Sequence, residues 1–319
     1  MVTGQDFRIL RIGHAALRVT DLAAASYFYV DVLGFVVARQ DSKALYLRGL
    51  AEFDIWTLAL LESREPGLDH VAFRVEHPED LEVLEALHRQ LGIPTKRVEE
   101  ELEPGQGPAL RVATPDGHPV EFYHSFEQVP VYDERGRVRL PMRTLHQARG
   151  VPPYFIDHIN VRVADPESSL SYWRDLLRFS ISEYAVRDGH IFAAWLRRRR
   201  GTHDIAVVRA NGPSLHHVAY HLSQPSDVLR AADLLADAGY RDRIDFGPGR
   251  HGTTDAFFLY VRDPSGNRIE LYFGDYQRDL DGEPIRWEWD DYDTGGRLWW
   301  SPEYPQRFLE TTPVNTTWP

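Results

Sequence analysis

The hydrophobic and polar positions of the chain fall into one pattern that recurs four times. Each repeat opens with a short alternating segment, typical of a half-buried strand, at residues 14–19, 70–75, 158–163 and 217–222. A stretch with apolar residues three and four apart follows, as in residues 81–91, and predicts a helix. Further alternating segments, such as residues 191–195 and 256–261, come next. The pattern predicts an α+β protein of four βαβββ modules in two tandem domains.

The two halves of the chain are similar enough to be aligned. Residues 9–65 match residues 154–210, and residues 114–123 match residues 263–272. The alignment places Glu121 at the position of Glu270. Proline and glycine within residues 263–266 favour a tight turn, so we expect Glu270 on the second strand of a hairpin. Equivalent residues of the two halves should therefore occupy equivalent places in the fold.

Composition shifts suggest where the domains begin and end. We expect an N-terminal module pair at 1–128, a linker at 129–153, a C-terminal module pair at 154–274 and a tail at 275–319. The linker holds several prolines among charged residues. The tail holds five of the eight tryptophans, and so aromatic a segment is not expected to be disordered. We expect it to pack over a domain as a lid on an active-site mouth.

Charge and cysteine content limit the classes of partner. The 319 residues carry a formal net charge of -12 and a pI of about 5.6. An acidic chain repels phosphate backbones and anionic lipid, so we expect neither nucleic acid nor membrane as a partner. The sequence has no cysteine, which excludes disulfides and thiolate metal sites. No apolar run approaches the length of a membrane span, and we expect a cytoplasmic protein.

Three side chains at equivalent points of the repeat suggest a metal site: His158, His217 and Glu270. Two imidazoles and one carboxylate hold a divalent first-row metal on one face and leave the other face open to substrate and oxygen. Residues two apart in a strand share a face, so Asn160 should point the same way as His158, and His216 should point away from the site. Each histidine alone is better explained as a polar residue on a solvated strand face. The equivalent repeat positions of the two histidines and Glu270 favour a metal site over that explanation.

The N-terminal half keeps the same residue types, at His14, His70 and Glu121. Its surroundings differ, because Ala16 stands where the C-terminal half has Asn160 and further histidines of the C-terminal half have no counterpart. A catalytic site needs acid and base groups as well as ligands. We therefore expect one divalent metal per chain, in the C-terminal half, and a structural role for the N-terminal triad.

Longer motifs around the C-terminal triad resemble a known family. They are Asp157-His158-x-Asn160, Ala194-Trp195 followed by His203, Asn211-Gly212-Pro213-x-x-His216-His217, Gly247-Pro248-Gly249-Arg250-His251-Gly252 and Tyr260-x-x-Asp263-Pro264-x-Gly266-x-Arg268-x-Glu270. In these motifs the chain resembles the type I extradiol ring-cleaving dioxygenases of the vicinal oxygen chelate superfamily, and among them the homoprotocatechuate (3,4-dihydroxyphenylacetate) 2,3-dioxygenases. The similarity spans nearly the whole chain.

The resemblance implies a role for each matched position. The metal, Fe(II) or Mn(II), would be held by His158, His217 and Glu270. His203 would face the oxygen site and act as a general acid, while Tyr260 and His251 would hydrogen-bond the catechol oxygens. Asn160 and Trp195 would shape the pocket. The implied reaction joins a catechol with both atoms of O2 to give a muconic semialdehyde, and we expect the enzyme to be a homotetramer.

The substrate side chain is where the sequence departs from this family. The homoprotocatechuate enzymes are expected to hold the substrate carboxylate with two arginines, but Phe246 stands at the first position. Arg297 keeps the second, and Arg243 or Arg250 could replace the first. We therefore expect 3,4-dihydroxyphenylacetate to be the best substrate, with a weaker preference over uncharged 4-alkylcatechols.

Two other functions fit the same fold. A glyoxalase-like isomerase would complete the metal sphere with a second glutamate, which the C-terminal motifs do not clearly supply. A metal-free protein that binds an aromatic compound would not need His203, His251 and Tyr260 around a ligand triad. Colour formation from a catechol under air separates an enzyme from a binding protein.

Overall fold

The strands of the N-terminal half form one mixed sheet. The computed structural model describes residues 6–99, 102–138 and 149–319. Within them the first sheet has eight strands in the order β2-β3-β4-β1-β5-β8-β7-β6. Its strands are β1 (Ile9–Val19), β2 (Val36–Gln40), β3 (Ala44–Arg48), β4 (Leu58–Glu62), β5 (Gly67–Val75), β6 (Thr95–Val98), β7 (Ala109–Ala113) and β8 (Pro119–Tyr123). Its helices are α1 (Leu22–Ser26), continued by the π-helical η1 (Tyr27–Leu33), and α2 (Asp80–Gln90).

The C-terminal half repeats this plan. Its nine-stranded sheet has the order β14-β15-β16-β13-β9-β12-β11-β10-β17. The strands are β9 (Phe155–Val163), β10 (Ser180–Arg187), β11 (His190–Arg197), β12 (Ile205–Arg209), β13 (Ser214–His221), β14 (Ile244–Arg250), β15 (Phe257–Arg262), β16 (Arg268–Phe273) and β17 (Ile285–Glu288). The helical segments are α3 (Pro166–Leu170), η2 (Ser171–Leu176), α4 (Pro225–Asp237), η3 (Arg241–Arg243), α5 (Trp289–Asp291), η4 (Tyr292–Gly296) and η5 (Gln306–Leu309).

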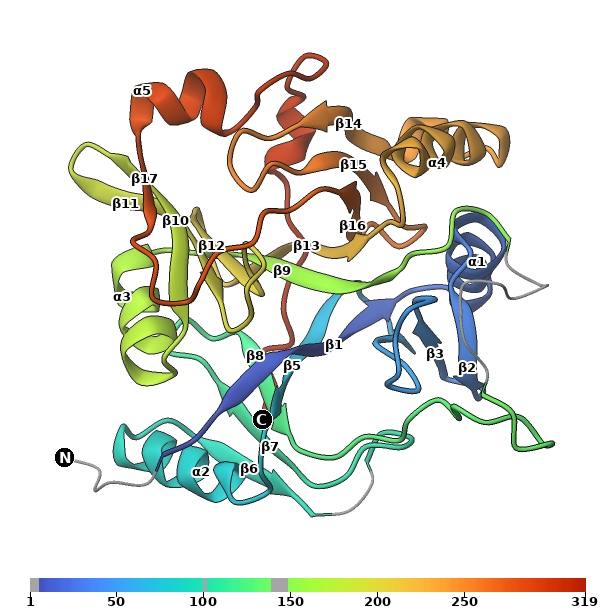
Figure 1. Cartoon of the computed structure of the whole chain (residues 1–319), viewed down its shortest axis with the longest axis horizontal. Coiled ribbons are helices and arrows are strands. Elements are labelled where there is room, and N and C mark those ends of the chain that lie inside the picture. Colours follow the sequence, from blue (N-terminus) through green and yellow to red (C-terminus); the bar gives the residue numbers. More distant parts are fainter. Residues whose placement is uncertain (1–5, 100–101, 139–148) are drawn as a thin grey trace.

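The predicted α+β fold of four βαβββ modules is confirmed. In each half, the first strands of the two modules pair antiparallel at the centre of the sheet, β1 with β5 and β9 with β13. The two halves lie against each other, with the N-terminal half below and the C-terminal half above in Figure 1. Apolar side chains from both sheets form one continuous core between them. Residues of β1 and β5 therefore occupy the same places in the first sheet as their repeat equivalents on β9 and β13 occupy in the second.

The turn at residues 263–266 forms as predicted. The amide of Gly266 donates to the carbonyl of Asp263, and Gly266 has a φ of +101°, which glycine adopts without strain. The hairpin pairs β15 with β16 and sets Tyr260 directly across from Glu270. Two candidate site residues therefore share one pair of neighbouring strands.

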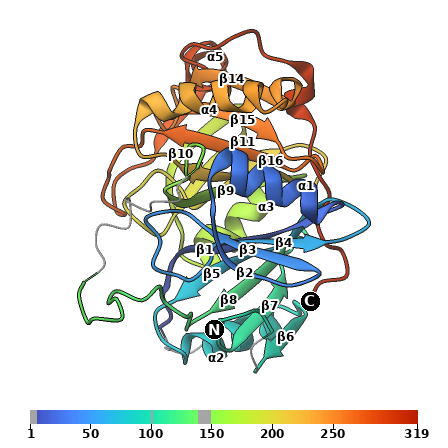
Figure 2. The same cartoon turned by 90° about the vertical axis from the view of Figure 1, so that its right-hand side faces the viewer.

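The tail runs from the C-terminal half back to the N-terminal half (Figures 1 and 2). β17 extends the second sheet beside β10, Thr312 pairs with Leu215 of β13, and Val314 pairs with Leu68 of β5. The predicted domain boundaries stay predictions, and residues 139–148 of the predicted linker lie outside the described residues.

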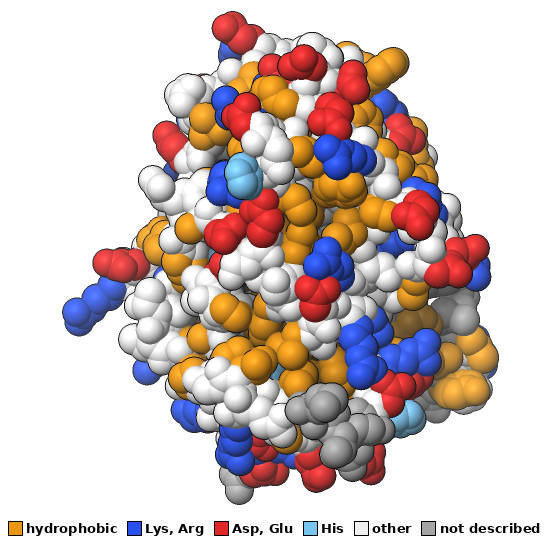
Figure 3. All heavy atoms as spheres, turned by 90° about the vertical axis from the view of Figure 1, so that its left-hand side faces the viewer, with side chains coloured by type: hydrophobic (Ala, Val, Ile, Leu, Met, Phe, Trp, Pro, Cys, Tyr) orange, Lys and Arg blue, Asp and Glu red, His pale blue; other side chains and the backbone are white. Residues whose placement is uncertain are grey.

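The surface shows mixed charge on the face in Figure 3, where acidic, basic and hydrophobic side chains are interspersed. None of the helices in the described ranges is long and apolar enough to cross a membrane.

Candidate metal centre and substrate cavity

The three predicted ligands come together on the central strands of the second sheet. His158 lies on β9, His217 on β13 and Glu270 on β16. Nε2 of His158 lies 3.2 Å from Nε2 of His217, and Oε2 of Glu270 lies 3.1 Å from both nitrogens. All three side chains are buried. Ligand atoms about 2.0–2.2 Å from one metal ion lie roughly 3 Å apart, so the spacing fits a shared ion.

Hydrogen bonds fix which nitrogen each ligand histidine presents. Nδ1 of His158 lies 2.8 Å from Oδ2 of Asp157, which can only accept, so Nε2 keeps its lone pair. Nδ1 of His217 lies 2.7 Å from Nδ1 of His216, and Nε2 of His216 donates to the carbonyl of Phe308 at 2.8 Å. A neutral His216 must therefore accept from His217. When each ring is neutral, Nε2 is thus the nitrogen that faces Glu270 with a lone pair for a metal.

Ionisation in the cluster suits a cation. Burial opposes the charged form of Glu270, but His217 and His158 hold its pKa well below the usual range. Burial lowers the pKa of His217 to about 4. Burial also opposes charge on His158, yet Asp157 and Glu270 raise its pKa to about 9. Glu270 is thus negatively charged, and the His158 imidazole favours a positive charge. A divalent ion can take the place of the proton that gives His158 this charge.

A cavity of about 330 Å³ opens on the triad. Beyond the ligands, its lining includes the predicted site residues Asn160, Trp195, His203, His251, Tyr260 and Arg297. Ligand pockets of enzymes typically range from about 300 to 1,000 Å³, so the cavity accommodates one small aromatic ring with a short substituent.

Tyr260 is held by a chain of hydrogen bonds that starts in the tail. Nδ1 of His251 lies 2.5 Å from the carbonyl of Arg297, which accepts, so Nδ1 carries the proton. Burial lowers the pKa of His251, so its Nε2 is a lone pair that accepts from the Tyr260 hydroxyl at 3.0 Å. Burial raises the pKa of Tyr260 well above its usual value. The phenol oxygen is therefore neutral and free to accept a hydrogen bond from a ligand.

His203 lies against the metal ligands. Its ring centroid is 3.8 Å from that of His158, and its Nδ1 is 3.0 Å from Oγ1 of Thr202. Burial, together with the neighbouring His158, lowers its pKa well below the usual value. A neutral imidazole beside the cavity can take up a proton and return it.

Comparison with known proteins agrees with this geometry. The family model described as "Glyoxalase/Bleomycin resistance protein/Dioxygenase superfamily" matches residues 155–271, and the model "Catechol 2,3-dioxygenase-like N-terminal domain" matches residues 68–127. A manganese-dependent 2,3-dihydroxybiphenyl 1,2-dioxygenase of Geobacillus genomosp. 3 is 34% identical over 92% of this chain and 95% of its own length. The chain belongs to the extradiol ring-cleaving dioxygenases. A metapyrocatechase of Geobacillus stearothermophilus is 33% identical over 97% of this chain and 95% of its own.

Solved structures of extradiol dioxygenases match the whole fold. Homoprotocatechuate 2,3-dioxygenase from Brevibacterium fuscum, in complex with 3,4-dihydroxyphenylacetate, superposes with a TM-score of 0.90 at 36% identity, over 98% of this chain and 95% of that chain. The predicted family, fold and class of metal-dependent dioxygenase are confirmed.

The arginines of this extradiol dioxygenase are arranged differently from the sequence expectation. Arg250 bonds the carboxylate of Asp255, Arg243 donates to the carbonyl of Asp263, and neither lines the cavity. Phe246 is buried among aromatic rings outside the lining. Arg297 does line the cavity. Of the expected arginines, the structure brings only Arg297 to the cavity.

Arg162 also lines the cavity, and the sequence analysis missed it. It is buried and donates to Oδ1 of Asn160 at 3.2 Å. Burial lowers its pKa to about 10, a value at which it still carries its charge at neutral pH. Among the described residues, no carboxylate lies within ion-pair distance of it. Strand alternation from His158 through Asn160 to Arg162 was the signal that could have found it.

The prediction that His216 points away from the site is wrong. The pairing of β13 with β9 shifts register between Leu215 and His217, so His216 sits in a bulge. Its ring therefore lines the cavity and contacts His217 instead of turning to the opposite face. A bulge leaves no clear mark in a single sequence.

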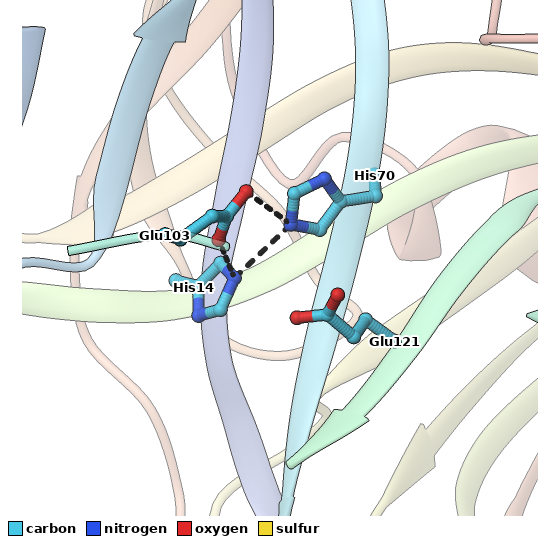
Figure 4. A group of neighbouring side chains, drawn as sticks. All are labelled: His14, His70, Glu103 and Glu121. Carbon is cyan, nitrogen blue, oxygen red and sulfur yellow. Dashed lines mark hydrogen bonds and ion pairs between the residues drawn. The ribbon is translucent and has the colours of Figure 1, made fainter. Parts of the chain in front are cut away.

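The N-terminal triad acquires a fourth member. Glu103, from the loop between β6 and β7, joins His14, His70 and Glu121, and their ligand atoms lie within 4.8 Å of one another (Figure 4). Both oxygens of Glu121 already accept hydrogen bonds, from Gln106 and from an arginine of β7. Among the described residues, the loop between β14 and β15 supplies no ligand to the C-terminal triad, which is why comparison of the two halves could not find Glu103.

Proposed function

We propose that this extradiol dioxygenase cleaves catechols that carry a short acidic side chain, with 3,4-dihydroxyphenylacetate as the best substrate. His158, His217 and Glu270 would hold Fe(II) or Mn(II), which would supply adjacent positions for the catechol oxygens and O2 and let electron density pass between them. The observation that carries the proposal is the cluster of three ligand atoms 3.1–3.2 Å apart at the end of the cavity.

Tyr260 and His203 would handle the protons of the substrate. Because the Tyr260 hydroxyl donates to His251, its oxygen can accept a hydrogen bond from one catechol hydroxyl and orient the ring. His203 is neutral and lies beside the ligands, so its Nε2 can take a proton and return it as the ring opens. Acid–base help of this kind is typically worth about 10²–10⁴-fold in rate.

Arg162 and Arg297 would hold the acidic side chain. Along β9, residues rise about 3.3 Å each, so Arg162 stands roughly 13 Å beyond His158 on the same face. That span suits a catechol ring plus a short side chain with its carboxylate farthest from the ligands. A buried guanidinium without a carboxylate partner in the described chain favours an anionic ligand, because burying an unpaired charge is costly.

The test is turnover of purified protein loaded anaerobically with Fe(II) or with Mn(II). We expect equimolar uptake of O2 and of 3,4-dihydroxyphenylacetate, with a yellow ring-opened product. Binding of the catechol without O2 uptake under either metal would support an aromatic-binding protein instead. Isomerisation of a substrate without O2 uptake would support the glyoxalase-like alternative.

The assembly and the cellular location remain proposals. We propose a homotetramer that acts in the cytoplasm, as the sequence predicted. Light scattering of the purified protein measures the first, and a monomer or dimer would contradict it. Fractionation of the source cells measures the second.

A further inference from the structure

Four buried side chains in the N-terminal half have the spacing of metal ligands. Nε2 of His14 lies 3.1 Å from Nε2 of His70, and the two oxygens of Glu103 lie 3.4 Å from one of these nitrogens each. Figure 4 shows the imidazole nitrogens and the carboxylate turned toward one point, with Glu121 beside them. Ligands at about 2.0–2.2 Å from a first-row ion lie roughly 3–3.5 Å from each other, which matches these separations.

The charges around this cluster call for two positive charges at its centre. Asp69 and Glu103 contact imidazoles of the cluster, and Glu121 lies beside them. These three side chains supply three negative charges. Arg111 contacts Glu121 at 2.7 Å and Glu103 at 4.0 Å, and it supplies one positive charge. Protonating both imidazoles would direct two Nε2–H groups at each other across 3.1 Å. One divalent cation balances the charge without that clash.

Hydrogen bonds around the cluster prepare particular atoms for a metal. Nδ1 of His70 lies 3.0 Å from Oδ2 of Asp69, whose other oxygen accepts from Nδ2 of Asn315 in the tail at 3.1 Å. A carboxylate on Nδ1 fixes the tautomer that presents Nε2 as a ligand, as Asp157 does for His158. Oε2 of Glu103 is buried with no hydrogen-bond partner in the described chain. Glu103 is therefore the carboxylate with the most capacity left for an ion, and each oxygen of Glu121, which accepts one hydrogen bond, keeps one further lone pair.

Aromatic side chains close this cluster from solvent. The Trp318 ring stacks on His70 at a centroid distance of 5.0 Å, and its Nε1 donates to the carbonyl of Val112 at 2.9 Å. Trp56 lies 4.5 Å from His14 by ring centroids. A metal site without an open position serves structure, whereas a catalytic one keeps a position for substrate.

We propose that His14, His70 and Glu103, with Glu121 as a fourth ligand, bind a second divalent first-row metal ion in a closed structural site. The ion joins β1, β5 and β8 to the Glu103 loop. Through Asp69 and Asn315 it also fastens the end of the tail to the N-terminal half. A donor set of two imidazole nitrogens and two carboxylate oxygens in a closed site favours Zn²⁺.

Counting metal in matched variants tests the second site. The full chain is freed of metal with a chelator, saturated with Zn²⁺, desalted and analysed for zinc per chain. We expect two equivalents in the wild type, one in Glu270→Ala, one in Glu103→Gln and none in the double variant. One equivalent in the wild type that Glu103→Gln leaves unchanged would overturn the proposal, and the N-terminal cluster would then be a buried ion-pair network.

A second measurement covers the case in which Glu103→Gln does not fold. Zn²⁺ is titrated into metal-free Glu270→Ala, whose N-terminal cluster is intact, and the melting temperature is followed. Binding to the native state alone stabilises it with ligand concentration, so we expect a saturable rise in Tm at one equivalent. A flat Tm with no bound zinc would overturn the second site. Because the catalytic triad is already disabled in this variant, its result is independent of the proposed activity.

Discussion

Nδ1 of His216 lies 2.7 Å from Nδ1 of His217, and this contact connects the tail to the proposed metal centre. Nε2 of His216 donates to the carbonyl of Phe308, so the tail sets the tautomer of His216 and, through it, that of His217. The carbonyl of Arg297 does the same for His251 and Tyr260. The tail thus acts on the site through two backbone carbonyls as well as through side chains that line the cavity.

We predict that His216→Phe weakens metal binding while leaving the three ligands in place. Residues that hydrogen-bond the second ring nitrogen of a ligand histidine typically raise metal affinity by about 10–100-fold. Phenylalanine cannot accept a hydrogen bond from Nδ1 of His217. Competition with a chelator measures the affinity. His190→Asn, which removes an exposed histidine, is the control and should bind as the wild type does. Equal affinity in His216→Phe would show that the hydrogen bond does not matter.

Removing the positive charge of Arg162 should change substrate preference. Charge-assisted hydrogen bonds are worth about 1.5–3 kcal/mol, so Arg162→Met should lower kcat/KM for 3,4-dihydroxyphenylacetate by about 10- to 100-fold. The value for 4-methylcatechol, which has no carboxylate, should change by less than about threefold. Arg297→Met should act in the same direction. Arg250→Met serves as the control, because Arg250 pairs with Asp255 outside the cavity.

One result would contradict the binding of a substrate carboxylate by Arg162 and Arg297. If the ratio of the two substrates is unchanged in both Arg162→Met and Arg297→Met, the natural substrate carries no acidic side chain at this end of the cavity. A loss in Arg250→Met alone would restore the expectation drawn from the sequence motif.

His203 should affect turnover and not metal content. His203→Gln removes the imidazole that lies 3.8 Å from His158 by ring centroids but takes away none of the three clustered ligand atoms. We expect full metal occupancy with kcat lowered about 10²–10⁴-fold, the usual effect of losing an acid–base group. Metal analysis and stopped-flow absorbance on the same sample measure both. Loss of metal would mean that His203 is itself a ligand.

Two truncations separate the roles of the tail. Ending the chain after Glu310 keeps the Phe308 carbonyl and removes Thr312, Asn315 and Trp318. We expect a lower Tm, because the stacking of Trp318 on His70 and the pairing of Thr312 with Leu215 are lost, with KM nearly unchanged because the Phe308 carbonyl stays. Ending it after Pro302 also removes Phe308, and we expect higher KM and weaker metal binding. Identical kinetics in both truncated proteins and the wild type would refute the lid.

Much of the fold and site followed from the sequence because both depend on strand alternation and on the repeat. The triad could be predicted because His158, His217 and Glu270 sit at equivalent repeat positions on regular strands. Arg162 was equally accessible, since it continues the face of His158 and Asn160. The same two-residue alternation, continued from Asn160, leads to Arg162.

Other features depend on departures from regular structure. The direction of the His216 side chain follows from a bulge in β13. The pairing of β14 shifts register on both sides of Phe246, so the place of Arg250 in its sequence motif did not show where its side chain points. Glu103 comes from the loop between β6 and β7, and the corresponding C-terminal loop supplies no ligand among the described residues. Such side chains are placed by tertiary contacts, which one sequence does not reveal.

The most direct test of the central claim compares wild type, Glu270→Gln and Glu85→Gln, loaded with Fe(II) or Mn(II) at the triad. Metal per chain, O2 uptake and formation of the ring-opened product are measured on the same samples with 3,4-dihydroxyphenylacetate. Glu270→Gln replaces the ligand carboxylate by an amide, whereas Glu85 lies on α2 and pairs with Arg89 at the surface. We predict that Glu270→Gln loses the triad metal, O2 uptake and product together, and that Glu85→Gln matches the wild type. Ring cleavage at an undiminished rate in Glu270→Gln would contradict the assignment of the reaction to this triad.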